Sequence, residues 1–362
     1  MTFEEFVQHA EAFARDNHEP GTLSLRHLQR LASGQPIGAL RPATARLLEH
    51  LFDEPITALL APPKSTVVNK NEDASTELRQ LIDAARRMDR STIELLHQQL
   101  NAIRQLDRQL GAIIVRDELK AKIRQVERLA TYSLAPGARE PLAALLSEMY
   151  TLAGWQTLDF GDITNAWQYY EQSRAAAAQS GSTIYESHAA AEQAFVLIDA
   201  GATRDAVDLL DYARRCADAT APRILRTWLA AAHGEALAAC GDHSASLHSF
   251  DQAAKLLPDD PSDARPYVAL NAVHLARWRG HVLAHFGDRA AVSVLTDALS
   301  VLDPSFVRAK TSLCVDLAKA FSASGHQSEA RDHASQAARL AKQIGSTRQY
   351  RRIKTLLEAN GY

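Results

Sequence analysis

The sequence has little of several features that mark particular classes of protein. Of its 362 residues only three are cysteines, Cys216, Cys240 and Cys314, and they lie far apart. An odd and scattered set of thiols does not make a disulfide framework, so we expect a reduced, cytoplasmic protein. The sequence has no run of 18 apolar residues, and its acidic, amphipathic start is unlike a secretory signal. We therefore expect neither a membrane span nor a leader.

Aromatic side chains and an excess of one charge are also scarce. Aromatic residues make up 6% of the chain, and 40 basic residues nearly balance 43 acidic ones, for a net charge of −3. This balance gives no overall attraction to nucleic acid or anionic lipid, so any DNA binding has to be local. The 46% hydrophobic and 23% charged content exclude wholesale disorder. The length predicts two or three domains.

The common signatures of catalysis are missing as well. We find no phosphate-binding glycine loop followed by Lys-Ser or Lys-Thr, no dinucleotide glycine fingerprint, no Cys-x-x-Cys pair and no nucleophile elbow. We therefore expect no enzyme, no cofactor and no bound metal. A hydrolase or transferase with a site in the groove of the repeats described below is the alternative.

The residues that are present favour helices almost throughout. Long segments repeat apolar residues at helical spacing and are rich in Ala, Leu, Arg, Gln and Glu, which predicts an all-α fold. Pro62, Pro63 and the polar residues after them predict a linker over residues 63–75, which follows a first domain of residues 1–62.

Residues 76–139 are predicted to form long helices that join the first domain to the rest. A single apolar stripe runs from Ile93 to Leu110, and arginines such as Arg104 and Arg108 occupy other positions. The pattern fits a packed helical hairpin with a solvated basic face. It also fits a coiled coil through which two chains dimerise.

Residues 140–362 carry a repeated pattern. Glycines recur 40, 40, 46 and 38 residues apart, at Gly161, Gly201, Gly241, Gly287 and Gly325. Seven residues before each of them stands a small residue: Gly154, Ala194, Gly234, Gly280 and Ala318. Five residues after them stand Ala166, Ala206, Ser246, Val292 and Ala330, and in the fourth repeat Ala291 is the better match. Antiparallel helices joined by a glycine turn approach closely where side chains are small, so we predict five stacked helix pairs.

This pattern resembles tetratricopeptide (TPR) repeats over residues 140–345, and the chain after them reads as capping helices with a basic outer face from Arg339 to Lys354. The resemblance implies an α-α solenoid with a concave groove. Four aromatic residues, Trp155, Trp167, Tyr169 and Tyr170, stand at positions that predict packing. The three cysteines are predicted to be small core residues.

A polar cluster in the fourth repeat is the main candidate for a binding site. Counted from the turn glycines, the resemblance places several polar or aromatic residues on the groove face: His188, Trp228, Glu235, Asn271, His274, Arg277, His281 and His285. Such a groove suits a peptide, an acidic small molecule or a partner protein. Two alternatives are zinc held by the histidines and a lining that only makes internal hydrogen bonds.

The N-terminal segment predicts a short helix over residues 24–34. Ser24 is a good N-cap, Leu28 and Leu31 share one face, and Gly34 ends the segment. This segment resembles the recognition helix of XRE-type helix-turn-helix repressors. Residues 2–7 resemble the helix before it, and residues 41–52 and 55–60 resemble the two helices that complete that domain.

The whole chain resembles actinobacterial helix-turn-helix regulators that carry a TPR-like sensor. The resemblance implies DNA contacts from one set of residues: Ser24, Arg26, His27, Gln29, Arg30 and Arg41. The spacing of 17 residues from Val7 to Ser24 predicts an enlarged turn, and we expect the domain to lack the helix that precedes Thr2 in the family. Residues 1–62 hold five arginines against eight acids, so a solvated face without DNA binding is the alternative.

Together these features predict a cytoplasmic, DNA-binding transcription regulator that works as a homodimer and senses an effector in the groove of its repeats. The competing hypothesis is a TPR interaction adaptor whose helix-turn-helix remnant no longer binds DNA.

Overall fold

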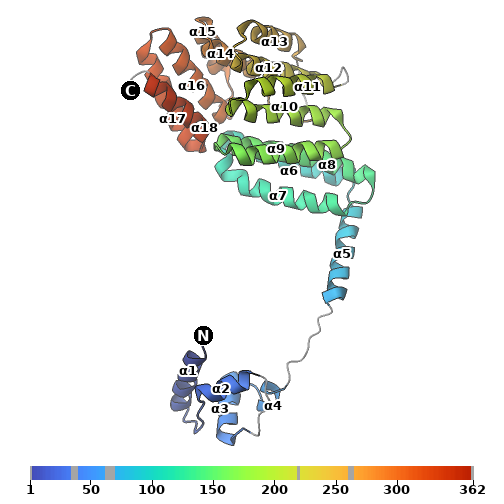
Figure 1. The fold of residues 1–362 in the computed structure, drawn as a ribbon, viewed down its shortest axis with the longest axis vertical. Helices are drawn as coiled ribbons and strands as arrows, with labels where there is room; N and C mark the ends of the chain where they lie inside the picture. The colour runs from blue at the N-terminus through green and yellow to red at the C-terminus, as the bar shows by residue number, and fades with distance from the viewer. Residues whose placement is uncertain (1, 34–39, 62–69, 218–220, 260–264, 360–362) are drawn as a thin grey trace. The chain divides into compact units, whose positions relative to one another are not determined.

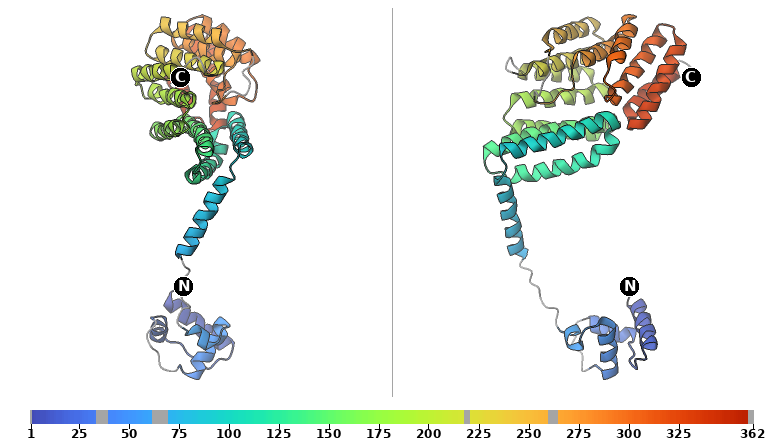
Figure 2. Two further views of the ribbon diagram at one scale, coloured as in Figure 1. Left: turned by 90° about the vertical axis from the view of Figure 1, so that its right-hand side faces the viewer. Right: turned by 180° about the vertical axis from the view of Figure 1, so that it is seen from behind.

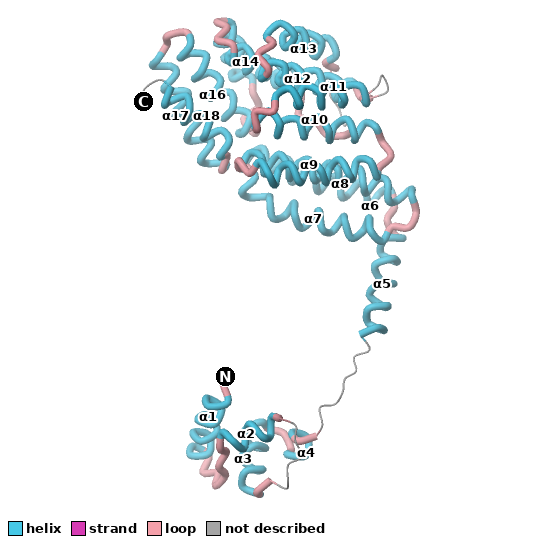
Figure 3. The backbone as a smooth tube through the Cα atoms, in the orientation of Figure 1, coloured by secondary structure: helices cyan, strands magenta, loops and turns pink. Residues whose placement is uncertain are grey.

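The computed structural model describes residues 2–33, 40–61, 70–217, 221–259 and 265–359, and every regular element in these ranges is an α-helix (Figure 3). The predicted all-α fold is therefore confirmed for the described residues. The chain divides into two compact units, Met1–Leu78 and Arg79–Tyr362. A search of the described helices for one both long and apolar enough to cross a membrane found none.

The first unit is a small helical cluster. Its helices are α1 (Phe3–Asp16), α2 (Leu25–Ala32), α3 (Pro42–Phe52) and α4 (Ile56–Leu59) (Figure 1). α1 begins at a capping box, in which the Thr2 hydroxyl accepts from the Glu5 amide and the Glu5 carboxylate accepts from the Thr2 amide. α1 extends to Asp16, and eight residues connect it to α2. In that connection a Cβ at Gly21 would lie 2.4 Å from the Ala43 carbonyl oxygen of α3.

The predicted linker is wrong over residues 70–75. Residues 62–69 lie outside the described residues, whereas α5 (Lys70–Arg86) begins at Lys70, so residues 70–75 are helical rather than linker. Pro63 is the last proline before this helix, and no residue from 70 to 86 is a helix breaker. Polar composition alone therefore misplaced the end of the linker.

The second unit is a stack of antiparallel helix pairs (Figure 1). The first pair is α6 (Arg90–Leu110) and α7 (Ala112–Tyr132). Five further pairs follow: α8 (Pro136–Asp159) with α9 (Ile163–Gln179), α10 (Thr183–Asp199) with α11 (Thr203–Cys216), α12 (Arg223–Ala239) with α13 (His243–Leu256), α14 (Ala272–His285) with α15 (Ala290–Val301), and α16 (Val307–Ala323) with α17 (Gln327–Ile344). α18 (Thr347–Ala359) ends the stack.

The five predicted helix pairs are present, and each turn is made by the predicted glycine. All five turn glycines have φ between 70° and 85°, the left-handed region that other residues rarely adopt. The small residues allow close contact as expected, because a Cβ on Gly154 or Gly234 would lie within 3 Å of the ring of Tyr170 or Phe250. In the fourth pair Ala291 is fully buried, which confirms the shift by one residue.

The long helices predicted over residues 76–139 are present, and α6 with α7 forms the predicted packed hairpin. The apolar stripe of α6 and the inner face of α7 share one buried cluster with α8, so this hairpin is the first layer of the stack. The predicted solvated basic face is wrong at two arginines. Arg104 is buried with its Nη2 atom 2.6 Å from Glu148, and Arg108 is half-buried with its Nη1 atom 2.7 Å from the Tyr267 hydroxyl.

The two ends of the stack meet. α16 packs against α6 and α18 packs against α8, so the last helices lie beside the first (Figure 2). Gly111, the turn between α6 and α7, touches the end of α17, where a Cβ would lie 2.3 Å from the Ile344 carbonyl oxygen. The basic outer face predicted for the capping helices is accordingly wrong at Arg352, which forms an ion pair with Asp316.

Only some of the aromatic residues and cysteines that were predicted to pack in the core are buried. Tyr170 is fully buried and Tyr169 packs against the cluster of the first layer, whereas Trp167 is exposed and Trp155 lines the cavity described below. The cysteines were all predicted in the core. Cys314 is buried and Cys216 half-buried, but Cys240 is exposed, because it caps α12 at the surface turn.

Candidate functional site

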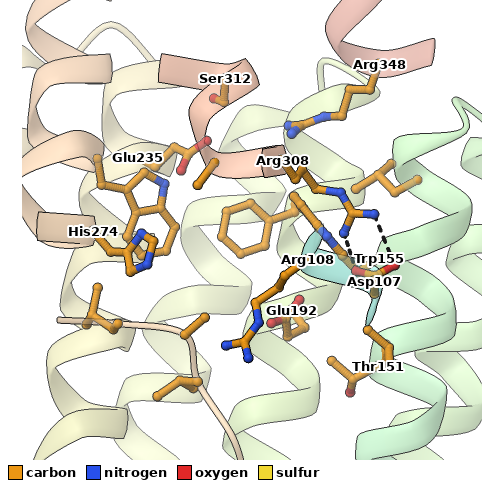
Figure 4. A pocket seen from close by; sticks show the side chains of 18 of the residues that line it. Asp107, Arg108, Thr151, Trp155, Glu192, Glu235, His274, Arg308, Ser312 and Arg348 are labelled. Carbon is orange, nitrogen blue, oxygen red and sulfur yellow. Dashed lines mark hydrogen bonds and ion pairs between the residues drawn. The ribbon is translucent and has the colours of Figure 1, made fainter. Parts of the chain in front are cut away.

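The closed stack of the second unit surrounds a cavity of about 560 Å³ (Figure 4). Its lining comes mainly from the first helix of each pair: α6, α8, α10, α12, α14 and α16, together with α18 and residues 267–270. Because side chains on one face of a helix recur every three or four residues, each of these helices contributes a stripe to the cavity. A volume of this size is typical of small-molecule sites.

Six of the eight predicted groove residues line the cavity: His188, Trp228, Glu235, His274, Arg277 and His281. The other two are not among its lining residues. Asn271 caps α14 by accepting from the His274 amide at 2.9 Å, and the ring of His285 packs edge-on against Phe286. His285 shares the stripe of His274 but lies 11 residues, about 16 Å, farther along the helix, beyond the edge of the cavity.

One ion-pair network joins the two ends of the stack across the cavity wall. Arg308 of α16 lies 2.6 Å from Asp107 of α6 (Figure 4). It also lies 3.1 Å from Asp159 of α8. The hydroxyl of Ser346 donates to Asp159 at 2.6 Å, and the amide of Gln156 donates to Asp107 at 2.9 Å. These contacts are buried, so removal of one partner would leave an uncompensated charge inside the fold.

A second network holds the loop before α14 against the first layer. The Glu148 carboxylate is buried, accepts from Arg104 at 2.6 Å and accepts from the Tyr267 amide at 3.1 Å. Burial raises the pKa of Glu148, but the charges of Arg104 and His97 and the Tyr267 amide outweigh burial and hold the pKa below its usual value. Glu148 is therefore ionised in the fold.

A third set of contacts ties α18 to the cavity. Asp316 of α16 lies 2.8 Å from His281 and 2.6 Å from Arg352. Burial raises the pKa of Asp316, yet the charges of His281 and Arg352 outweigh burial and hold that pKa far below its usual value. Arg348 lies 2.6 Å from Asp199 of α10, so α18 is held to α16 and to α10 by buried charges.

Three lining groups are neutral at pH 7. Burial lowers the pKa of His188 and of His274 to about 4, so both imidazoles are uncharged. Burial raises the pKa of Glu192 to about 8, so its carboxyl group keeps its proton. The ring centroid of His188 lies 5.5 Å from that of Trp228, which continues an apolar wall.

Sequence analysis missed several lining residues that the register of the repeats contains. The residue 13 positions before the turn glycine is His188, Trp228 and His274 in the second, third and fourth pairs. In the first and fifth pairs it is Glu148 and Ser312, which also line the cavity. Extending that register to all five pairs would have found them. The cavity arginines of α6 and α18 lie outside the five pairs, so no repeat position pointed to them.

The zinc hypothesis gains no geometric support. Among the residues that the structure describes, no group of three or more His, Cys, Asp or Glu side chains is arranged to hold a metal ion. His281 instead makes its contact with Asp316.

The predicted DNA-contact residues lie in the first unit. Leu28 and Leu31 pack against its core, while Arg26, Gln29, Arg30 and Arg41 are exposed, His27 is half-buried and Ser24 caps α2 by accepting from the His27 amide. Exposed residues on the side opposite the packed leucines are free to reach a ligand. The predicted terminal Gly34 lies outside the described residues.

Comparison with known proteins gives structural similarities only. No family model matches the sequence, and no curated protein matches it. The chain is similar to BtubC (BKLC) from P. vanneervenii, with 13% identity and a TM-score of 0.44 over 66% of this chain and 92% of the other.

It is also similar to a protein of kinesin light chain type with nearly identical TPR-like repeats from Podosopora anserina, with 19% identity and a TM-score of 0.35 over 53% of this chain and 94% of the other. A single-residue variant of that protein gives 19% identity and a TM-score of 0.36 over 53% and 92%. Similarity of this size carries no inference about activity or partners. The assignment to stacked helical hairpins rests on the helix pairs of this chain.

Proposed function

We propose that this protein is a DNA-binding transcription regulator whose second unit senses a ligand bound in the cavity inside the helix stack. The observation that carries the proposal is the cavity of about 560 Å³ at the centre of the helix stack, lined by charged and aromatic side chains. Charged groups are costly to bury, and replacing buried ion pairs with apolar residues is often neutral or stabilising. A cavity built from them is therefore better explained by ligand recognition than by packing.

The DNA-binding part of the proposal is supported by α2. Arg26, Gln29 and Arg30 are exposed, while the leucines of the same helix pack inward. Arginine and glutamine side chains suit bidentate contacts with base edges in the major groove. Because residues 1–62 carry a net charge of −3, few cations are available for phosphates, and these arginines would supply much of the affinity.

Ligand binding would act on the closure of the stack. A ligand that fits only the closed form would favour the contacts of α16 and α18 with the first layer, and it shifts the equilibrium only by its difference in affinity for the two forms. In a homodimer such a shift would change the separation of two DNA-binding units.

A gel shift of the full-length protein, with the DNA that flanks its own gene, tests this function at several salt concentrations. We expect binding that weakens steeply with salt. An Arg26→Ala/Arg30→Ala variant is expected to bind at least about 30-fold more weakly, since a good bidentate base contact contributes about 1–3 kcal/mol. Arg15→Ala, at an exposed position in the last turn of α1, is the matched control and should bind like the wild type.

Absence of any shift at 50 mM salt would refute the regulator and favour the adaptor. A purely monomeric state in light scattering, with and without DNA, would refute the paired arrangement.

A further inference from the structure

Of the seven arginines that line the cavity, three have no carboxylate partner among the described residues: Arg108, Arg277 and Arg351. Arg351 is exposed, with its Nη1 atom 3.5 Å from the Gly161 carbonyl oxygen, whereas Arg108 and Arg277 are half-buried. Four lining arginines each lie 2.6 Å from a carboxylate oxygen: Arg104, Arg308, Arg348 and Arg352. Among the described residues, no carboxylate forms an ion pair with Arg108 or Arg277, although both line the cavity. A buried guanidinium without an anion is unfavourable, so its presence beside a cavity points to an anion that comes from outside.

The contacts of Arg108 leave part of its guanidinium available. Its Nη1 atom donates to the Tyr267 hydroxyl at 2.7 Å, and its central carbon lies 4.6 Å from the centroid of the Phe306 ring. Its Nε atom is buried and has no hydrogen-bond partner in the described structure. Figure 4 shows the side chain extending into the cavity on the side of His274.

Arg277 is in a similar state on α14. Its Nε atom is also buried without a partner among the described residues. Burial lowers the pKa of Arg277, an effect that the charges of Asp316 and Glu235 oppose. An arginine nevertheless stays protonated in a protein. Burial is the largest cause that lowers the pKa of His274, and the charges of Arg277 and Arg108 come next. Both arginines therefore lie near His274, in the same part of the cavity.

An aromatic wall lies in the same cavity. The ring centroids of Phe195, Trp228 and Trp278 are 6.1–6.3 Å apart, and the rings of Phe195 and Trp278 are within 16° of parallel. All three residues line the cavity. Such a wall accepts a flat apolar group at low entropic cost.

The other features of the cavity favour a small anion over an extended peptide. The two arginines and the aromatic wall lie within one cavity of about 560 Å³, a volume that suits a small molecule. Because burial raises the pKa of Glu192 to about 8, this carboxyl group adds no negative charge that would repel an anion at neutral pH.

We propose that the cavity binds a small organic acid, with its anionic group held by Arg108 and Arg277 and its flat apolar body against Phe195, Trp228 and Trp278. The proposal rests on the sensor role proposed above and names the class of ligand.

Two dyes that differ in one charged group test this proposal on the full-length protein. 8-Anilinonaphthalene-1-sulfonate and N-phenyl-1-naphthylamine share their aromatic rings, but only the first carries an anion. We expect the sulfonate to bind at least about 10-fold more tightly, since hydrogen bonds to charged groups contribute about 1.5–3 kcal/mol. We expect 1-naphthoate to displace it and inorganic phosphate to leave it bound, because the apolar body is part of recognition.

Variants show whether the dye binds in the cavity. Among the described residues, neither Arg108 nor Arg277 forms an ion pair that a glutamine would break, so Arg108→Gln and Arg277→Gln are each expected to fold. Each should weaken sulfonate binding about 10- to 100-fold while the affinity for the neutral amine stays unchanged. Arg339→Gln, at an exposed position of α17, is the matched control and should bind both dyes like the wild type. Circular dichroism of every variant checks that the helices are intact.

The proposal is overturned if the two dyes bind equally, or if both glutamine variants keep full affinity for the sulfonate, since the dye would then bind exposed apolar surface. Displacement by phosphate alone would mean a simple anion site without the aromatic wall. DNA binding is measured separately. Selective dye binding without a gel shift would keep the ligand class and refute the regulator, whereas a gel shift without dye selectivity would do the reverse.

Discussion

Replacement of Glu192 by glutamine should stabilise the second unit, and the gain should grow with pH. The Glu192 carboxyl is largely buried beside the cavity, with the Tyr170 hydroxyl at 3.4 Å and His188 at 3.8 Å, and no arginine forms an ion pair with it among the described residues. Burial raises its pKa from 4.5 to about 8. The folded state therefore prefers the protonated form.

The sign of the pH dependence follows from proton binding in the two states. Below pH 4.5 the folded and unfolded chains both hold the proton, so Glu192 costs nothing. As the pH rises from 4.5 to 8 the unfolded chain loses the proton while the folded chain keeps it, so stability falls. At about 1.4 kcal/mol per pKa unit, the loss is at most about 3 kcal/mol at pH 7 and levels off near 5 kcal/mol above pH 8.

Urea unfolding of the full-length protein at pH 5, 7 and 9, followed by circular dichroism, measures this effect. Glutamine is uncharged at every pH, so the free energy of unfolding of Glu192→Gln should exceed that of the wild type by about 1 kcal/mol at pH 5 and by several kcal/mol at pH 9. Glu118→Gln, at an exposed position of α7, is the matched control. A difference between Glu192→Gln and wild type that is the same at all three pH values would refute the reasoning.

Two further predictions concern stability and use the same unfolding measurement. Gly234→Ala should lower the free energy of unfolding by about 1–3 kcal/mol, because the new Cβ would lie 2.8 Å from the ring of Phe250. Gly137→Ala, where a Cβ would meet nothing within 4 Å, should leave that free energy unchanged. Equal losses for the two variants would contradict the close approach of the two helices. Arg308→Met should lower the free energy of unfolding by about 3–5 kcal/mol, because it leaves two buried aspartates without a cation. Lys354→Met breaks an exposed ion pair within α18 and should lower it by less than about 0.5 kcal/mol. Similar small losses for both would mean that the buried pairs do not hold the stack closed.

The helix pairs were predictable because their causes are local. A turn glycine with positive φ and a small residue seven positions earlier are needed wherever two antiparallel helices meet closely, as at Gly154 and Gly234. The same register placed His188, Trp228 and His274 on the inner face. Neither inference needed knowledge of distant segments.

The arginines of α6 show where such reasoning fails. In sequence Arg104 and Arg108 stand beside an apolar stripe, a pattern that fits a solvated face equally well. Their partners Glu148 and Tyr267 are 44 and 159 residues away, so only the three-dimensional arrangement reveals that these arginines are inside. The prediction for residues 70–75 was wrong for a local reason, because a polar segment without proline is compatible with both a helix and a linker.

By itself, the sequence determined that this chain folds into helices, where the five central pairs turn, and which face of α10, α12 and α14 points inward. Only the tertiary structure decided that the stack curves far enough for α16 and α18 to meet α6 and α8 around the cavity. Curvature is the sum of small rotations between neighbouring pairs, and no single residue spacing encodes that sum. The same closure selects which charges are paired and leaves Arg108 and Arg277 facing the space within.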